Sequence, residues 1–570
     1  MCKKAYSMFK IREIPEATFS QSMWSSDIDV TPLDEVPFTV DGRLGTAKPL
    51  YAVSSGVSIP VKSALVKTQI GKDDLFREEI AAMNDGHVPP NLVPMKLGPH
   101  RDSEDPENIV FPMEEATRPF VGDVFLPDSS SFKIGLNVGM RRFGKATGKF
   151  DAPILTKEQA VAGEVKLGLK SLTRATSVGY PLCREAKDKR DYFGVEEKPD
   201  FTSVKAIQLL TEIDMLEDLI RQGYRPQFVC RDFLKDEVRK EGKGARLIAG
   251  TDLRYYILCR MYFGAFVGAV CRTHLESGLC LGLNPTSEWG ALRRKLLTPD
   301  PSGKNVWDGD FAGFDSSQMP RLLWDCLDYI NNWYSLHGGT QEENDIRTIL
   351  FMDLVYSRHI TGHQGVFTTV VEWCKSLPSG HFLTSTINSM ISIGLIGAGY
   401  VGLTGRIDFS DTSAAVVQGD DNLVSTCDEL VGVFNQVTLS DFLKKEFGMV
   451  YTAGRKGEDL KPVIGIDEVV FLQRRFAVKM GHDVCPIRPE SFLSSMYYVH
   501  TQDAVRTKEV LLSSAESALE ELSMHDEKYW DLVAPKLVAI KIGFNDAPLH
   551  STMTSADYLE VVRSRVPSYV

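Results

Sequence analysis

The chain has 570 residues, of which 43% are hydrophobic and 25% are charged, and its 64 basic and 76 acidic side chains give a net charge of −12. These proportions exclude wholesale disorder and fibrous architectures, and the length allows about three to four domain-sized units or one large enzyme. The acidic balance argues against a histone-like protein that binds phosphate over its whole surface. It is still compatible with a local basic channel inside an acidic shell.

Targeting and cysteine patterns indicate the compartment. No stretch of about 18 uncharged apolar residues appears, because Arg260 interrupts one candidate and a glycine series beginning at Gly394 interrupts the other. Two early lysines have no apolar stretch behind them, so no secretory signal is expected. The ten cysteines include no C-x-x-C pair, which indicates neither a zinc knuckle nor a disulfide framework. We therefore expect a soluble intracellular protein with buried, reduced cysteines.

The N-terminal half is predicted to change from irregular to helical structure. Residues 1–50 contain four prolines and little periodicity, which indicates an extended arm with short strands. Residues 85–130 are rich in Pro, Asp and Gly, a composition typical of irregular connections. Apolar residues in 203–222 recur at intervals of three and four, and this spacing predicts a helix.

The C-terminal half is predicted to mix short strands with helices. Residues 306–311 are strand-like, and residues 319–334 have helical spacing of apolar side chains before a pair of glycines. Two β-prone runs, 414–418 and 423–425, flank the sequence GDDN, which predicts a β-hairpin. The pattern after residue 490 is helical. The expected fold class is α+β.

Four aspartates stand at the ends of these predicted strands. Asp310 follows a β-prone run at the end of VWDGD, Asp315 begins the next helix, and Asp420 and Asp421 occupy the hairpin turn. If the strands are neighbours these carboxylates converge, and converging carboxylates persist mainly where a cation holds them. Oxygen ligands suit Mg²⁺ or Mn²⁺, and two such ions about 4 Å apart promote phosphoryl transfer. The alternative is a simple turn, since Gly, Asp and Asn all favour turns.

Two further segments could bind sugar and phosphate groups. A loop at Ser379 and Gly380 leads into a helix that carries Thr384 and Asn388 one turn apart, where small polar side chains could contact a sugar hydroxyl. Residues 221–246 carry eight basic against four acidic side chains. That strip is either a solvated charged surface or a phosphate-binding strip.

In chain order, five segments resemble a known family. FLKDEVRKEGKGARLI, WDGDFAGFDSSQMP, PSGHFLTSTINSM, VVQGDDNLVS and FLQRRF resemble motifs F, A, B, C and E of viral RNA-dependent RNA polymerases, most closely those of the picornavirus-like group. TSVGYP, at residues 176–181, is similar to a segment in the fingers of those enzymes. The matched segments span residues 176–476, and five motifs in order are far more specific than one.

The resemblance implies a closed right hand of fingers, palm and thumb, with an antiparallel sheet in the palm, that encircles template and nascent RNA. The expected division is an N-terminal arm or extension at 1–60, fingers at 61–305 with the palm starting from about 251, palm at 306–336, a fingers insert at 337–376, palm again at 377–490 and a thumb at 491–570.

The resemblance also implies roles for individual residues. Asp310 and Asp420, assisted by Asp421, resemble metal ligands, and Lys456 resembles the lysine proposed to protonate departing pyrophosphate. The residues that resemble the ribose-reading group are Asp315, Ser379, Gly380, Thr384 and Asn388. Those that resemble the triphosphate-binding cations are Lys235, Arg239, Lys243 and Arg246. Those that resemble the primer grip are Gln473, Arg474 and Arg475.

The activity implied by the resemblance is template-directed RNA synthesis from NTPs by two-metal-ion nucleotidyl transfer, which replicates the genome of a positive-strand RNA virus. The implied cofactor is Mg²⁺, with Mn²⁺ as a substitute. The implied partners are template RNA, nascent RNA and NTPs, and the resemblance also suggests a protein primer and other viral replication proteins. We expect release from a polyprotein, no transmembrane segment, and a location in the host cytoplasm at membrane-associated replication complexes.

Two departures and two rival functions accompany this interpretation. Gln418 stands where a tyrosine usually precedes GDD, and Gln473 stands where lysine is common. The sequence GAGYVG, beginning at Gly397 and followed by Asp420, nearly matches a dinucleotide-binding fingerprint, so one rival is an NAD-dependent oxidoreductase. Against it, the residues before Gly397 continue a helix instead of forming a strand. The other rival is a non-catalytic RNA-binding protein on a polymerase fold.

Overall fold

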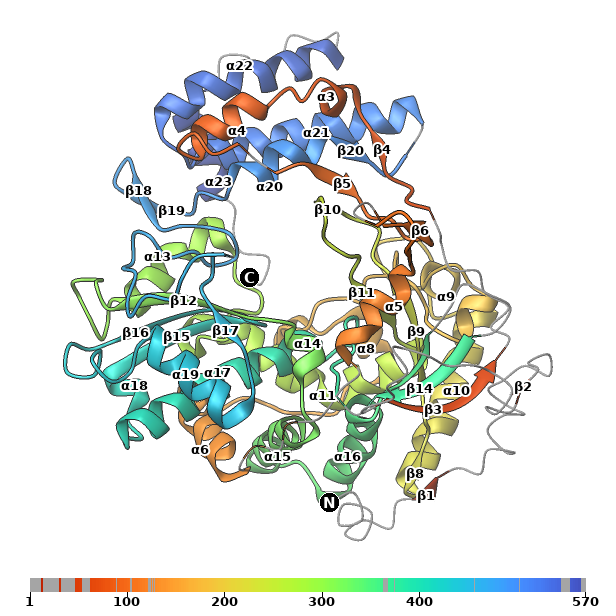
Figure 1. The fold of residues 1–570 in the computed structure, drawn as a ribbon. Helices are drawn as coiled ribbons and strands as arrows, with labels where there is room; N and C mark the ends of the chain where they lie inside the picture. Colours follow the sequence, from red (N-terminus) through yellow and green to blue (C-terminus); the bar gives the residue numbers. More distant parts are fainter. Residues whose placement is uncertain are drawn as a thin grey trace.

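The computed structural model describes residues 62–544 and 554–564, together with the strand residues 12–13, 30–31 and 47–53. The residues excluded within these ranges are 89, 103–104, 121–124, 126, 128, 362–367, 374, 456 and 502. Long helices lie beside small sheets throughout the described chain (Figure 1). The predicted α+β class is confirmed.

A four-stranded antiparallel sheet lies at the centre of the predicted palm, in the order β15-β16-β12-β17. Its strands are β12 (Val306–Phe311), β15 (Ser413–Gln418), β16 (Asp421–Thr426) and β17 (Tyr451–Thr452). The predicted strand at 306–311 and the predicted hairpin are both confirmed. β15 pairs with β16 up to Gln418 opposite Asp421, which leaves Gly419 and Asp420 as a two-residue turn. Gly419 has φ +66°, a conformation that favours glycine.

Both faces of this sheet are buried. Successive side chains of a strand point to opposite faces, and Trp307 and Val424 join a large apolar cluster whereas Val306 and Leu423 join a second one. The helices that pack on the sheet are α13 (Pro285–Leu296), α17 (Thr384–Thr404) and α19 (Gln436–Phe447). Packing on both faces fixes the strands that carry the predicted site.

A six-stranded sheet, in the order β11-β9-β13-β14-β3-β2, forms a second body. Its strands are β2 (Val30–Thr31), β3 (Ala47–Val53), β9 (Val229–Leu234), β11 (Leu247–Gly250), β13 (Arg358–Thr361) and β14 (Thr368–Trp373). The predicted insert at 337–376 therefore adds β13 and β14 to strands of the basic strip. The strand β3, from the predicted N-terminal arm, pairs with β14.

Helices surround these sheets. The predicted helix at 203–222 is confirmed as α10 (Val204–Arg221), and the predicted helix after motif A is confirmed as α15 (Pro320–Leu336). α10 packs against α11 (Leu253–Arg272), and α15 packs against α16 (Gln341–Val355). The predicted irregular region holds only short elements, which are β5 (Leu92–Pro94), β6 (His100–Arg101), β7 (Ile109–Val110), α5 (Pro112–Thr117) and η2 (Arg118–Phe120).

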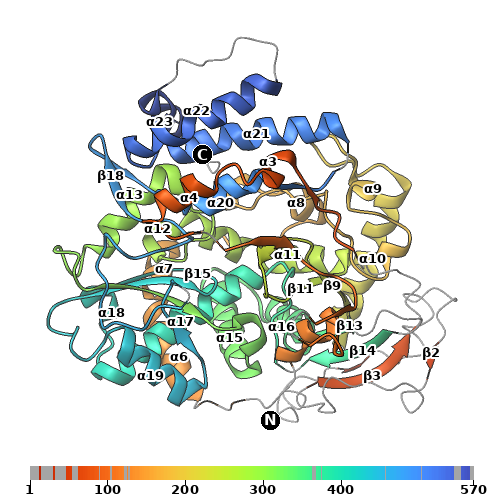
Figure 2. The same cartoon turned by 45° about the horizontal axis from the view of Figure 1, so that its top comes forward.

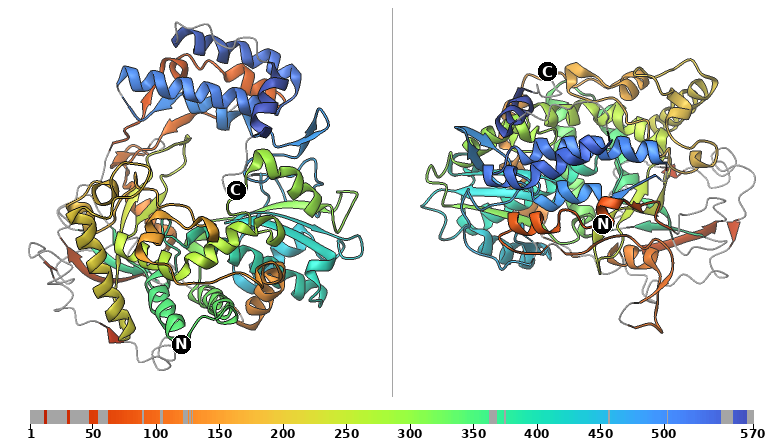
Figure 3. Two further views of the ribbon diagram at one scale, coloured as in Figure 1. Left: turned by 180° about the vertical axis from the view of Figure 1, so that it is seen from behind. Right: turned by 90° about the horizontal axis from the view of Figure 1, so that it is seen from above.

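The C-terminal region is helical, as predicted, and an N-terminal segment packs on it. Its helices are α20 (Pro489–Leu493), α21 (Ala504–Leu522), α22 (Glu527–Phe544) and α23 (Ser555–Ser564), and Figure 3 shows α21 and α22 side by side. Ile70 of α3 (Gln69–Lys72) and Ile80 of α4 (Arg77–Met83) share an apolar cluster with Leu493 and Leu519. The boundary predicted at 61 assigned α3 and α4 to the fingers, whereas their contacts lie with the predicted thumb.

Two strand pairs connect the N-terminal segment, residues 66–94, to the C-terminal helices at one end and to the basic strip at the other. β4 (Val66–Lys67) pairs with β20 (Tyr498–Val499) beside the C-terminal helices. Further along, β5 pairs with β10 (Val238–Lys240), which belongs to the basic strip. Residues 66–94 thus run from the C-terminal helices to the body that contains the six-stranded sheet (Figures 1 and 2).

The glycines of GAGYVG serve helix packing. They lie inside the continuous helix α17, which crosses α6 (Ser129–Gly139). A Cβ on Gly397 would lie 2.2 Å from the carbonyl oxygen of Gly135, and a Cβ on Gly135 would lie 2.3 Å from the backbone nitrogen of Ala398. Because a dinucleotide fingerprint needs a strand, a glycine turn and then a helix, the NAD-dependent alternative is wrong.

Helix α17 is also the one helix among the described residues that is long and apolar enough to cross a membrane. In its most apolar window, 83% of the residues are buried inside the protein. Its neighbours are α6, α15 and α19. The burial indicates a central core helix.

The remaining elements are short or peripheral. They are β1 (Arg12–Glu13), α7 (Arg141–Thr147), α8 (Lys157–Ala162), η3 (Val165–Leu167), η4 (Leu182–Arg184), α9 (Arg190–Phe193), β8 (Tyr224–Arg225), α12 (His274–Ser277), α14 (Phe314–Ser317), α18 (Phe409–Thr412), β18 (Ala477–Lys479), β19 (His482–Val484) and η5 (Ser494–Met496).

Candidate active site

The palm sheet brings Asp310 and Asp420 together. β12 lies between β16 and β17, with Gly309 opposite Asn422 and Asp310 opposite Thr452, so Asp310 lies one residue before the end of its strand, next to the hairpin turn. Partial desolvation by the surrounding protein and the negative charge of Asp310 both raise the pKa of Asp420. Two carboxylates in this arrangement repel when both are ionised, and a cation or a shared proton relieves that repulsion.

Asp421 lies beside this pair but is hydrogen-bonded elsewhere. Its Oδ2 accepts the backbone N–H of Leu472 at 2.7 Å. Burial raises the pKa of Asp421 to about 8. Within the described ranges, no three His, Cys, Asp or Glu side chains are grouped to hold a metal ion. The structure therefore brings together Asp310 and Asp420, and the roles of all three aspartates as metal ligands stay predictions.

The predicted ribose-reading residues lie around the start of α17. The amide of Asn388 donates from Nδ2 to Asp315 Oδ1 at 2.6 Å, and Gln318 donates to Asn388 Oδ1 at 3.2 Å. Burial raises the pKa of Asp315. The charge of Asp315 also contributes to the raised pKa of Asp420, so this polar group is within electrostatic reach of the carboxylate pair.

The other three members of that predicted group shape the loop before α17. Ser379 accepts the N–H of Ala249 through its carbonyl at 2.8 Å, which joins the loop to β11. Gly380 has φ +120°, and a Cβ there would lie 2.5 Å from the Ala249 carbonyl oxygen. The hydroxyl of Thr384 donates to the carbonyl of Pro378 at 2.6 Å. Ser379, Gly380 and Thr384 thus fix the loop before α17, whereas Asp315 and Asn388 form a hydrogen bond with each other.

Three cations of the basic strip converge on one carboxylate. Lys235, Arg239 and Arg246 all form ion pairs with Glu237, at 3.2 Å for Lys235 and 3.8 Å for Arg239. The pKa of Arg246 is raised first by its bond to Glu237 and also by the charge of Asp420, which connects this group electrostatically to the palm aspartates. Lys243 lies in an exposed turn. These three cations therefore form an organised cluster around Glu237.

The predicted primer grip forms a tight turn in which its members differ. Phe471 and Arg474 exchange backbone hydrogen bonds at 2.9 and 2.8 Å around the turn. Arg474 is buried and forms a bidentate pair with Glu521 of α21, at 2.8 and 2.6 Å. Gln473 and Arg475 are exposed. Lys456, the predicted general acid, lies outside the described residues.

Sequence reasoning missed two carboxylates of this region. Glu237 organises the basic strip, and its position among the cations was a usable signal. Asp308 is buried under the site and accepts the N–H groups of Gly454 and Val470 at 3.0 and 2.9 Å. Its position two residues before Asp310 predicts the same face of β12, but the two segments that it binds have no signal in the sequence.

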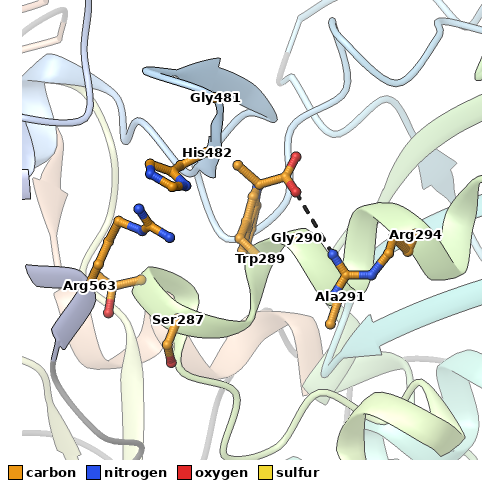
Figure 4. A pocket seen from close by; sticks show the side chains of 10 residues that line it. Ser287, Trp289, Gly290, Ala291, Arg294, Gly481, His482 and Arg563 are labelled. Carbon is orange, nitrogen blue, oxygen red and sulfur yellow. Dashed lines mark ion pairs between the residues drawn. The ribbon is translucent and has the colours of Figure 1, made fainter. Parts of the chain in front are cut away.

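A cavity of about 260 Å³ lies apart from these residues, between α13 and the turn that joins β18 to β19 (Figure 4). Arg294, His482 and Arg563 line it, and Arg294 is 4.0 Å from Asp483, which offsets part of the positive charge. None of the predicted site residues lines this cavity.

The sequence around this site matches a known family. The family model described as viral RNA-dependent RNA polymerase matches residues 147–539, more than half of the chain. The chain belongs to this family. The match includes every predicted site residue.

Curated relatives of this chain include replicase polyproteins of insect viruses. It is 25% identical over 414 residues to the replicase polyprotein of Drosophila C virus, covering 68% of this chain and 23% of that protein. It is 28% identical over 409 residues to the replicase polyprotein of acute bee paralysis virus, covering 66% and 20%. The chain thus spans about a fifth of the length of these relatives.

A solved structure confirms the polymerase fold. The Sicinivirus 3Dpol RNA-dependent RNA polymerase superposes with a TM-score of 0.69 at 19% sequence identity, covering 89% of this chain and 98% of that chain. The expected right hand with an antiparallel palm sheet is therefore confirmed for this polymerase. The domain boundaries within it stay predictions.

The buried carboxylates predict a pH-dependent stability. The pKa of Asp421 is raised from 3.8 to about 8 in the folded protein, so the folded state binds this proton more tightly than the unfolded state does. Protonated Asp421 therefore contributes fully to the free energy of unfolding below about pH 4. This contribution is lost as pH rises toward 8, by at most about 1.4 kcal/mol per pH unit. Without divalent ions, Asp421→Asn should therefore melt progressively above wild type between pH 4 and pH 8.

Thermal unfolding in EDTA at several pH values measures this difference. Asp441→Asn, at an exposed position of α19, is the matched control and should show no such trend. A constant difference between Asp421→Asn and wild type across that pH range would contradict the assignment of a raised pKa.

Proposed function

We propose that this chain catalyses template-directed RNA synthesis from NTPs and replicates the genome of a positive-strand, picornavirus-like virus. The observation that carries the proposal is the pairing of Asp310 with Asp420 at the end of the palm sheet, next to the Asp315–Asn388 contact, in a chain of the polymerase family. Family relatives are described as replicase polyproteins.

The donor set fits a divalent cation. Asp310 and Asp420 offer oxygen ligands only, and burial together with mutual repulsion disfavours their ionised pair in the absence of positive charge. We infer that they hold Mg²⁺, or Mn²⁺ as a substitute, with Asp421 assisting through the oxygen that Leu472 does not occupy. When bound, two such ions supply Lewis-acid charge for in-line attack of a primer hydroxyl on the α-phosphate.

The chain's own residues then bind and orient the substrates. Lys235, Arg239 and Arg246, with Lys243, neutralise the triphosphate, which competes with Glu237 for these cations. Asp315 and Asn388 orient the ribose through its 2′-hydroxyl. Lys456 is proposed as the donor of a proton to pyrophosphate.

RNA and protein partners follow from the same proposal. Gln473 and Arg475 are the exposed residues of the turn that contacts the primer end, whereas Arg474 fixes that turn to α21. The segment of residues 66–94, joined to both sides of the molecule, supports a closed path around template and product. We further propose a protein primer, other viral replication proteins as partners, and work at membrane-associated complexes in host cytoplasm.

Ribose selection gives a direct mutational test. Asn388→Ala removes the 2.6 Å hydrogen bond to Asp315, so Asp315 loses its fixed orientation and selectivity for NTP over dNTP should fall about tenfold. The measurement is the ratio of kcat/KM for an NTP and its dNTP. Asn344→Ala, which removes a buried amide in α16, should leave that ratio unchanged. An unchanged ratio in Asn388→Ala would remove Asn388 from the ribose site.

The activity itself is tested by incorporation of labelled NTPs on a primed homopolymeric RNA, with Mg²⁺, with Mn²⁺ and with EDTA. The proposal predicts extension that needs metal and prefers NTPs over dNTPs. RNA and NTP binding without extension under either metal would instead favour the non-catalytic RNA-binding alternative.

A further inference from the structure

Asp308 is a buried carboxylate that the proposed chemistry does not use. It lies two residues before Asp310 on β12, and alternate side chains of a strand share a face, so both project from the same face of the sheet. Only 1% of Asp308 is exposed. A buried carboxylate is strongly unfavourable unless hydrogen bonds compensate it, so its two partners matter.

These partners come from segments that are distant from β12 in the chain. Oδ1 accepts the N–H of Gly454 at 3.0 Å, and Oδ2 accepts the N–H of Val470 at 2.9 Å. Gly454 lies in the loop after β17, and Val470 directly precedes the turn of residues 471–474. A Cβ on Gly454 would lie 2.8 Å from Asp308 Cγ, so the close approach requires glycine.

The turn of residues 471–474 needs external support. Leu472 and Gln473 have φ values of +52° and +62°, a left-handed conformation that is disfavoured for residues other than glycine. Such strain persists only where the surroundings fix it. Asp308 holds the residue before the turn, and Asp421 holds Leu472 within it. Two carboxylates of neighbouring palm strands therefore fix this turn through its backbone.

We propose that Asp308 is a positioning residue for RNA synthesis, because it sets the turn of residues 471–474 and the loop at Gly454 relative to Asp310. This inference rests on the proposed function, in which the turn contacts the primer end and Asp310 acts on the reacting phosphate. The carboxylate touches neither substrate and acts only through the two backbone N–H groups.

Asp308→Asn keeps the shape of the side chain but replaces one acceptor oxygen with an NH₂ donor that faces a backbone N–H. The turn or the loop must then shift, and the primer end shifts relative to Asp310. Because misplacement by about 1 Å can lower a rate about a hundredfold, we expect kcat to fall about 10- to 100-fold. The KM for NTP should stay within about threefold of wild type, since the contacts of Lys235 and Arg246 are unaffected.

Asp300 provides the matched control. It is also buried, 4% exposed, and its carboxylate accepts the N–H groups of Asn305 at 2.7 Å and Ser302 at 3.0 Å in the loop before β12. Asp300→Asn removes the same kind of bond without touching residues 454 or 470–474. Both substitutions should lower the Tm, but Asp300→Asn should keep kcat within about twofold of wild type.

Hydrogen exchange gives a readout that does not depend on activity. In Asp308→Asn, amide exchange should accelerate in both segments, 451–455 and 469–475, and in Asp300→Asn it should accelerate in neither. If Asp308→Asn does not fold, Gly454→Ala disturbs the same contact from the other side and should give the same kcat and exchange changes.

Unchanged exchange in either segment, or an equal fall of kcat in Asp300→Asn and Asp308→Asn, would overturn the proposal. A wild-type protein that makes no RNA would count against the proposed function, and the exchange measurement would still decide whether Asp308 fixes both segments.

Discussion

Asp420→Ala is expected to lower the rate of RNA-directed nucleotide incorporation about a thousandfold, or about 4 kcal/mol in activation free energy. Asp420 occupies the turn between β15 and β16 and shares its site with Asp310, whose negative charge raises the pKa of Asp420. Its loss removes one of two converging oxygen ligands, so the charge that develops on the phosphate oxygens is no longer stabilised. Single-turnover extension of a primed RNA measures this effect.

The control separates lost chemistry from lost structure. Asp411→Ala removes an exposed carboxylate from α18, immediately before β15, and should keep extension within about twofold of wild type. Asp420→Ala should melt no lower than wild type in EDTA, because it relieves repulsion with Asp310. Extension by Asp420→Ala above about one tenth of the wild-type rate would contradict the assigned role.

Gly397→Ala is expected to lower the stability of the whole protein by about 2–3 kcal/mol. In an exposed helix the same change would gain about 1 kcal/mol, because alanine favours helices more than glycine does. Here the added Cβ would lie 2.2 Å from the carbonyl oxygen of Gly135, and a backbone atom cannot move aside without separating α6 from α17. Thermal unfolding of the apo-protein measures the change.

Gly144→Ala is the matched control for this substitution. Gly144 also lies within a helix, α7, but its Cβ would meet only the hydroxyl of Tyr329, at 3.6 Å. That variant should melt at or above the wild-type temperature. A Gly397→Ala variant as stable as Gly144→Ala would show that the α6–α17 contact tolerates a methyl group.

Local patterns predicted several elements of the palm. The strand at 306–311, the helix after it and the hairpin around GDDN were readable because each combines a clear period with its own turn residues, and the structure confirms all three. The packing of α3 and α4 on the C-terminal helices was not readable, because more than 400 residues separate Thr68 from Met496, to whose carbonyl its hydroxyl donates at 2.6 Å. No local pattern specifies a contact of that kind.

Some contacts of the candidate site were also predictable from the sequence, and others were not. The positions of Asp310 near a strand end and of Asp420 in a hairpin turn predicted that the two meet, and the family resemblance grouped Asp315 with Asn388. Both pairs interact. The bonds of Asp421 to Leu472 and of Arg474 to Glu521 were not predictable, since each depends on how the turn of residues 471–474 packs against other elements. The glycines at 397–402 show the converse case. They resemble a nucleotide-binding pattern, but in the structure they allow α17 to pack closely against its neighbouring helices.

The measurement that tests the central claim most directly is sequencing of the RNA that the wild-type protein makes on a primed heteropolymeric template with Mg²⁺. The proposed function predicts a product complementary to the template, and omission of one NTP should stop synthesis at the first template position that requires it. Nucleotide addition that ignores the template, or no product with either Mg²⁺ or Mn²⁺ despite binding of RNA and NTP, would contradict the claim.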